Sequence, residues 1–143
     1  MQTKIIDETE LLHIAEQMLR IAISGGDSAM FVAVSILTGD RVTCCDEAVV
    51  FACDSLCGVA TIAPLGEMGE GLPTIVGLYV RQTDRRKGYG SVLLEAAVRR
   101  CLDRGFEIIR IDAVTTGALR VIGKLPVDLQ KRLEVHDVRL PGF

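Results

Sequence analysis

The residues best suited to chemistry in this chain form a basic glycine loop at residues 85–90, with the sequence RRKGYG. Its two glycines allow the backbone to approach a ligand closely, and the first turn of a helix leaves N–H groups without a partner inside the helix. Such donors bind phosphate, and the cationic side chains add charge that suits a diphosphate. The alternative is a surface turn with solvated basic residues, because short glycine motifs often match by chance.

Two regular elements are needed to position this loop. Residues 74–80 (TIVGLYV) are rich in β-branched and aromatic types, which predicts a buried strand. Residues 91–104 place apolar side chains at three- and four-residue spacing, which predicts an amphipathic helix, and Gly105 ends it. The order of strand, loop and helix favours an anion site, although the sequence contains neither G-x-G-x-x-G after a strand nor G-x-x-x-x-G-K-[ST].

The pattern that remains, Arg85-x-x-Gly88-x-Gly90, resembles the coenzyme A signature R/Q-x-x-G-x-G/A of the GNAT superfamily, the acyl-CoA-dependent N-acyltransferases. The resemblance is strongest over residues 74–105 and extends more loosely over most of the chain. It implies an α/β fold of the α+β kind. The expected architecture is a mixed, mostly antiparallel central sheet, splayed between two parallel strands and flanked by helices on both faces.

The resemblance also implies acetyl-CoA as the cosubstrate, with its pantetheine arm along the strand and its diphosphate on the loop. Carried over by position, backbone groups of Leu78, Tyr79 and Val80 would hold the arm and the thioester, and the Val80 N–H would polarise the thioester carbonyl. The other cofactor-binding residues would be Arg85, Arg86, Lys87, Gly88, Tyr89, Gly90, Ser91 and Thr115.

The general acid that is usual in this family is missing. Many members continue with N-x-x-A-x-x-x-Y, in which the tyrosine protonates the departing thiolate. Here the corresponding stretch reads Thr115-x-x-Ala118-x-x-x-Ile122, and Ile122 cannot donate a proton. Either Tyr79, another group or water replaces the acid, or the chain does not catalyse acyl transfer.

The general base that deprotonates the amine is expected to be a carboxylate. Glu67 and Glu70 lie in the loop before the strand, Asp112 lies on the neighbouring strand, and we assign the role to Glu70. The two histidines, His13 and His136, are better explained by packing or by solvent exposure than by catalysis.

The cysteines indicate neither a metal site nor covalent catalysis. They are odd in number and follow no zinc-finger spacing, so we expect reduced thiols and no metal. A covalent route through Cys44 and Cys45 is set aside, because no nearby histidine or cluster of cations would lower the pKa of these thiols. The five residues are Cys44, Cys45, Cys53, Cys57 and Cys101.

Composition narrows the function classes. The chain has 143 residues, 49% of them hydrophobic, and a mean hydropathy of +0.34, which predicts one compact domain over residues 1–143. A net charge of −3 disfavours general nucleic-acid binding. The sequence shows no leader-like start and no apolar stretch approaching 18 residues, so we expect a cytoplasmic protein that does not enter membranes.

The rest of the chain predicts the remaining elements. After a short first strand, Asp7 should cap a helix with Glu10 three residues on. A second helix, a hairpin, a strand after the amphipathic helix, one helical segment and a last strand should follow. The expected ranges are 3–6 for the first strand, 28–37 for the second helix, and 47–53 with 57–63 for the hairpin. They are 107–113 for the strand after the amphipathic helix, 116–133 for the helical segment and 134–140 for the last strand.

Two function classes remain open. The first is an acetyl-CoA-dependent N-acetyltransferase, in which a primary amine attacks the thioester directly in a ternary complex. The second is a catalytically inactive acyl-CoA-binding regulatory module, with a weaker third reading as an interaction domain without a nucleotide ligand. The acidic approach loop favours a cationic acceptor, such as a polyamine, an aminoglycoside-like compound or an amine of a protein. An edge strand near the C-terminus would allow a homodimer.

Overall fold

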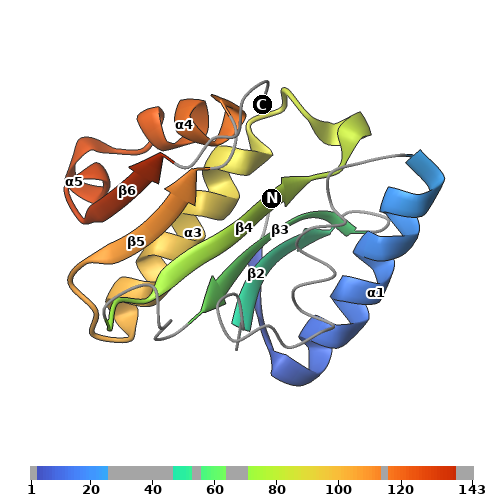
Figure 1. Cartoon of the computed structure of the whole chain (residues 1–143), viewed down its shortest axis with the longest axis horizontal. Helices are drawn as coiled ribbons and strands as arrows, with labels where there is room; N and C mark the ends of the chain where they lie inside the picture. The colour runs from blue at the N-terminus through green and yellow to red at the C-terminus, as the bar shows by residue number, and fades with distance from the viewer. Residues whose placement is uncertain (1–2, 26–46, 53–55, 64–70, 114–115, 138–143) are drawn as a thin grey trace.

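The computed structural model describes residues 3–25, 47–52, 56–63, 71–113 and 116–137 (Figure 1). These ranges contain a sheet, several helices and the glycine loop. In chain order the elements are β1 (Thr3–Asp7), α1 (Glu8–Gly25), β2 (Glu47–Ala52), β3 (Leu56–Ala63), β4 (Thr74–Val80), the 3-10 turn η2 (Gln82–Asp84), α3 (Tyr89–Asp103), β5 (Ile109–Ala113), α4 (Thr116–Gly123), α5 (Val127–Gln130) and β6 (Leu133–Asp137).

The described strands form one mixed sheet in the order β1-β2-β3-β4-β5-β6. Neighbours from β1 to β4 are antiparallel, whereas β4 with β5 and β5 with β6 are parallel. The parallel pairs are joined through α3 and through the α4–α5 segment, as parallel neighbours require a long connection. The expected mixed and mostly antiparallel sheet is confirmed, and so is the hairpin of β2 and β3.

Helices cover both faces of the sheet, as expected. Along β2, Ala48 and Val50 face the side of α1, whereas Val49 faces the side of α3, because successive strand residues point to opposite faces. One buried cluster joins β1–β4 to α1, and the other joins the sheet to α3, α4 and α5. Figure 1 shows α3 behind β4 and β5, and α1 near the other end of the sheet. None of the described helices is both long and apolar enough to cross a lipid bilayer.

The sheet opens between β4 and β5. The two strands pair only through Thr74 with Arg110 and Ile75 with Ile111, although β4 continues to Val80. Among the described strands, the remaining part of β4 has a partner only in β3. The expected splay between the two parallel strands is therefore confirmed, with its closed end at Ile75 and its open end at the start of the glycine loop.

Most element boundaries agree with the sequence to within two residues. β4 has the predicted bounds, and Asp7 caps α1 by accepting a hydrogen bond from the Glu10 N–H at 3.0 Å. α3 begins two residues earlier than predicted because Gly88 is its N-cap. The single helical segment over 116–133 is wrong: Pro126 starts a separate short helix, α5. The helix expected at 28–37 lies outside the described residues.

The two cysteines among the described residues differ in state. Cys57 is disulfide-bonded, so the expectation of reduced thiols is wrong for this residue. Cys101 is free and buried in the core beneath α3, which agrees with the expectation. The other three cysteines lie outside the described residues.

Glu47, the first residue of β2, binds the C-terminal end of α3. Its carboxylate accepts hydrogen bonds from Arg100 Nε at 3.0 Å and from Arg100 Nη2 at 3.2 Å. Arg104 Nη1 lies 3.2 Å from the same carboxylate. The hydrogen bonds from Arg100 to Glu47 raise the pKa of Arg100 above its usual value. Because bidentate bonds between charged groups are the strong ones, this cluster fixes α3 against the sheet.

We expect Glu47→Gln to lower the free energy of unfolding by about 1–2 kcal/mol, because a neutral amide cannot accept both bonds from Arg100. The value is modest because the Arg100 side chain is 34% exposed and regains water. Glu95→Gln is the matched control, since its bond to Arg99 at 3.2 Å joins two surface side chains. Denaturant unfolding should show a loss below about 0.5 kcal/mol for the control. Equal losses in both variants would contradict the role of Glu47.

Candidate functional site

A β-bulge in β4 determines which backbone groups face the splay. The β3–β4 register pairs Ile62 with Ile75 but Thr61 with Gly77, so Val76 is an extra residue on β4. A bulge of this kind leaves one residue unpaired and shifts the alternation of the strand by one position. Residues after Val76 therefore direct their backbone groups to the opposite side from the one that an unbroken strand would give them.

A hydrogen bond just beyond β4 fixes this direction. The Arg81 N–H donates to Cys57 O at 2.7 Å. Hydrogen-bonded residues alternate along an antiparallel strand, so Arg81 and every second residue before it direct their backbone groups toward β3. Tyr79 belongs to that series. Leu78 and Val80 are out of phase with it, and their N–H and C=O groups point to the side of the splay. Within the predicted backbone site along β4, Leu78 and Val80 therefore face the gap and have no β5 residue opposite them among the described residues.

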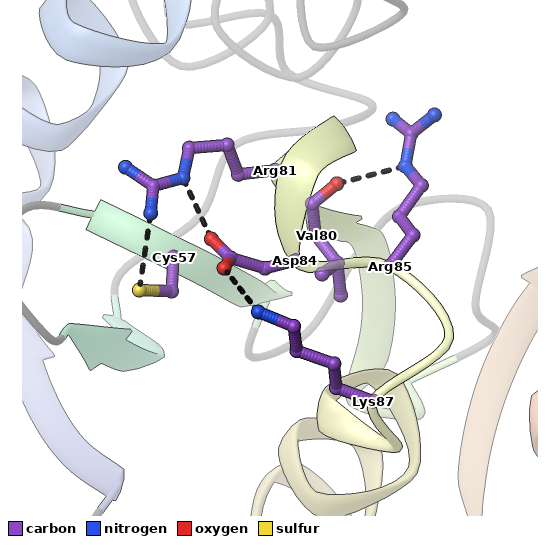
Figure 2. A network of polar contacts seen from close by, with 6 residues as sticks. All are labelled: Cys57, Val80, Arg81, Asp84, Arg85 and Lys87. Atoms are coloured by element: carbon purple, nitrogen blue, oxygen red, sulfur yellow. Dashed lines mark hydrogen bonds and ion pairs between the residues drawn. The ribbon is translucent and has the colours of Figure 1, made fainter.

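The side chains at the end of β4 alternate between the two faces. Tyr79 is 4% exposed and packs in the cluster beneath α1, whereas Leu78 and Val80 pack against the cluster beneath α3. Arg85 Nε donates to Val80 O at 3.0 Å, and its guanidinium carbon lies 5.9 Å from the centre of the Tyr79 ring. The Arg85 side chain thus folds back over the end of β4, and Figure 2 shows it pointing away from Lys87.

Asp84 holds the first half of the loop together. This carboxylate is only 6% exposed and accepts hydrogen bonds from Arg81 Nε at 2.6 Å and from Lys87 Nζ at 3.3 Å (Figure 2). The hydrogen bond from Arg81 is the main cause that lowers the pKa of Asp84, and Lys87 adds to it. Sequence reasoning missed Asp84. The available signal was a cation three residues away on each side.

The second half of the loop delivers the start of α3. Arg86 has φ +67° and the N-cap Gly88 has φ +82°, and the first backbone bond of the helix runs from the Val92 N–H to Gly88 O at 3.3 Å. A Cβ at Gly90 would lie 3.4 Å from Val121 of α4 and 3.9 Å from Val80. The absence of a side chain at Gly90 therefore lets the helix start, the end of β4 and α4 meet closely.

These elements form a continuous surface for an extended ligand with an anionic end. Backbone groups of β4 supply hydrogen bonds along the splay, and the helix start with its loop supplies donors and positive charge. The predicted residues Leu78, Val80 and Arg85 to Ser91 follow one another along these elements, whereas Tyr79 pairs with β3 and its side chain is buried on the face of α1. Among the described residues, no three His, Cys, Asp or Glu side chains gather as a metal site would require.

The residues considered for acid and base chemistry lie in different parts of the fold. Ile122 is 7% exposed in the α3-side cluster, so it serves as a core residue. Asp112 lies on β5, whose backbone borders the splay. The first histidine, His13, is exposed on α1. Three other predicted residues, Glu67, Glu70 and Thr115, lie outside the described residues.

Comparison with known proteins identifies the pattern. A model of the acetyltransferase (GNAT) family matches residues 28–124. No curated protein gives a significant match to the sequence. Several solved structures share the fold at low sequence identity.

One similar structure is the ribosomal-protein-alanine N-acetyltransferase from Brucella melitensis biovar Abortus 2308. Its TM-score is 0.59 at 19% identity, and the match covers 87% of this chain and 90% of that chain. An aminoglycoside acetyltransferase from an uncultured soil metagenomic sample, in complex with sisomicin, has a TM-score of 0.56 at 18% identity, and the match covers 83% of this chain and 82% of that chain. A GCN5-related N-acetyltransferase from Ralstonia eutropha JMP134 has a TM-score of 0.54 at 14% identity, and the match covers 88% of this chain and 93% of that chain. At these identities the likeness shows a common fold.

The Asp84 contacts predict a pH-dependent contribution to stability. Because the folded protein lowers the pKa of Asp84 below the usual value of 3.8, the ionised form is favoured in the folded state. The contribution is complete well above pH 3.8 and is lost as the pH falls through the folded-state pKa. We expect Asp84→Asn to be less stable than wild type at pH 7, and this difference to shrink on acidification. Thermal unfolding at a series of pH values measures it.

Asp128→Asn is the control for this series, since Asp128 is an exposed carboxylate in the first turn of α5. Its stability should stay close to that of wild type over the same pH range. A difference between wild type and Asp84→Asn that stays constant down to pH 2 would exclude a role for the ionised Asp84 carboxylate.

Proposed function

Because the chain belongs to the GNAT acetyltransferase family, we propose that it transfers an acetyl group from acetyl-CoA to a primary amine. The single observation that carries the proposal is the open edge of β4. Leu78 and Val80, which have no β5 partner among the described residues, lead directly into the glycine loop and the start of α3. A chain of amides followed by a diphosphate matches that surface in both chemistry and order.

The binding roles follow from the direction of each group. The backbone groups of Leu78 and the N–H of Val80 would pair with the arm as an added strand would, whereas Val80 O already accepts a hydrogen bond from Arg85 Nε. The N–H groups from Gly88 to Ser91 would hold the diphosphate, with charge supplied by Arg86 and Lys87. Arg85 would contribute mainly from its backbone, because its side chain is bonded to Val80 O. Thr115 is proposed to hydrogen-bond to the arm, as the family pattern suggests.

The transfer itself needs a polarised carbonyl and a neutral amine. By resemblance the backbone N–H of Val80 is the proposed donor to the thioester carbonyl. The Leu78 N–H has the same orientation one step nearer the closed end of the splay and is the alternative donor. The amine nitrogen attacks the carbonyl carbon and the carbon–sulfur bond breaks. The departing thiolate takes its proton from water or from Tyr79, because Ile122 has none to give. Glu70 is the proposed carboxylate base.

A cationic amine is the proposed class of acceptor. The acidic segment before β4 contributes Glu67 and Glu70, which would attract a positively charged group. The names of two structural neighbours, a ribosomal-protein-alanine N-acetyltransferase and an aminoglycoside acetyltransferase, support an amine acceptor of either protein or small-molecule type. We place this activity in a single cytoplasmic domain.

The second candidate is an acyl-CoA-binding regulatory module without catalysis. The observation that favours it is the buried Ile122, which occupies the position of the family's acid tyrosine. Both candidates require the same ligand site, so binding and turnover must be measured separately.

We expect titration calorimetry to detect acetyl-CoA binding that Gly88→Glu weakens by about 100-fold or more. This change puts a carboxylate at the helix start and forces a side chain into a left-handed backbone with φ +82°. Gly105→Glu is the matched control, because Gly105 has φ +93°, equally open surroundings and a position at the opposite end of α3. Equal loss in both variants would attribute the effect to strain and count against the loop as the binding site.

Release of free CoA on addition of amines then separates the two candidates. Amine-dependent release supports the transferase, and binding without release by any amine supports the regulatory module. Absence of binding by folded wild-type protein would exclude both candidates together.

A further inference from the structure

The C-terminal strand β6 places a histidine beside the closed end of the splay. Pairing between β4 and β5 ends at Ile75 with Ile111, so Asp112 is the first β5 residue beyond the last pair. β6 runs parallel to β5, and its register puts His136 directly opposite Asp112. His136 is therefore one strand away from the point at which β4 and β5 part.

The side chain of His136 lies on the sheet face that carries α1. Leu133 packs against the cluster beneath α3, so alternation along β6 places Glu134 and His136 on the opposite face. On that face the described helix is α1, which packs against β1–β4. The His136 and Glu134 side chains are 36% and 49% exposed. Within the described part of the chain, this face of β5 and β6 is open to an approaching molecule.

His136 and Glu134 form a hydrogen-bonded pair. His136 Nε2 lies 2.7 Å from Glu134 Oε1. When the ring is neutral and Nε2 carries its proton, the carboxylate accepts this hydrogen bond and Nδ1 keeps a lone pair for a further proton. Among the described residues, the β5–β6 register places Arg110 opposite Glu134 and Asp112 opposite His136.

The proposed ligand path brings the thioester into the gap on the other side of β5 from His136. The diphosphate would lie at the open end of the splay, so an arm that follows β4 runs back toward the closed end at Ile75 and Ile111. The thioester is the end of the arm farthest from the diphosphate, so on this path its carbonyl would meet the Leu78 N–H, the donor nearer the closed end, rather than that of Val80. The face occupied by α3, α4 and α5 is filled by core side chains, so an amine would approach from the face of His136.

From this arrangement, and resting on the proposed function, we propose that His136, held by Glu134, accepts the proton that the acceptor ammonium must lose. The N–H bond of the ammonium breaks and the proton passes to His136 Nδ1, directly or through one water. The neutral amine then bonds to the carbonyl carbon, and the electron pair of the carbon–sulfur bond leaves with the CoA sulfur. The exposed imidazolium returns its proton to solvent. In this proposal His136 takes the role of general base that was proposed above for Glu70, so the two residues are alternatives.

The test compares His136→Gln with His13→Gln, since these are the two histidines of the chain and His13 is exposed on α1. Spermidine and an alanine-initiated peptide serve as probe amines. We expect His136→Gln to lower kcat/KM for the amine by about 100-fold at pH 7 and to leave acetyl-CoA affinity unchanged. The deficit should shrink as the pH approaches about 10, where an alkyl amine loses its own proton. His13→Gln should behave as wild type.

A second readout does not depend on turnover. With the imidazole signals assigned by the two variants, addition of spermidine to the CoA complex should shift the NMR signal of His136 and leave that of His13 in place. Unchanged kcat/KM in His136→Gln, or a deficit that does not depend on pH, would overturn the role of His136 while leaving the transferase intact. Acetyl-CoA binding with no CoA release from wild type by any amine would overturn the proposed transfer, and this role with it.

Discussion

The opening between β4 and β5 is the constraint on which the rest of the site depends. Buried backbone groups almost always find partners, yet β4 pairs with β5 only through its first two residues. The bulge at Val76 then turns the groups of Leu78 and Val80 toward the gap. A ligand made of amides could complete the sheet there, and the chain that leaves the strand at once becomes the loop that we propose binds its phosphates.

Contacts at both ends of α3 hold the helix start and the glycine loop in place. At the far end, Glu47 ties Arg100 and Arg104 to β2. Closer to the loop, a Cβ on Gly58 would lie 2.6 Å from Leu93 Cδ1 and 3.0 Å from Tyr79 O, so this glycine lets the helix approach the sheet. Before the start of α3, Asp84 fixes the turn that leads into the loop. Such support gives a ligand a site that needs little ordering, which reduces the entropy cost of binding.

The sequence predicted the parts of this architecture that depend on local pattern. β4 and α3 follow from composition, apolar spacing and glycine positions, and the GNAT-like order then implied the splay. The bulge at Val76 and the parallel pairing of β6 depend on register between distant segments, which no local pattern records. Asp84 looked like any loop carboxylate until its burial between two cations was visible. His136 gained interest only from its place beside β5 and its contact with Glu134.

The charges of the loop differ in kind from its backbone donors. Arg85 and Arg86 are exposed, and half of the Lys87 side chain is in water, so their attraction acts through solvent and is screened within roughly 8–10 Å at physiological ionic strength. Backbone N–H groups act only at contact and are nearly insensitive to salt. Ionic strength should consequently slow the encounter between the protein and a polyanionic ligand far more than it shortens the lifetime of the complex.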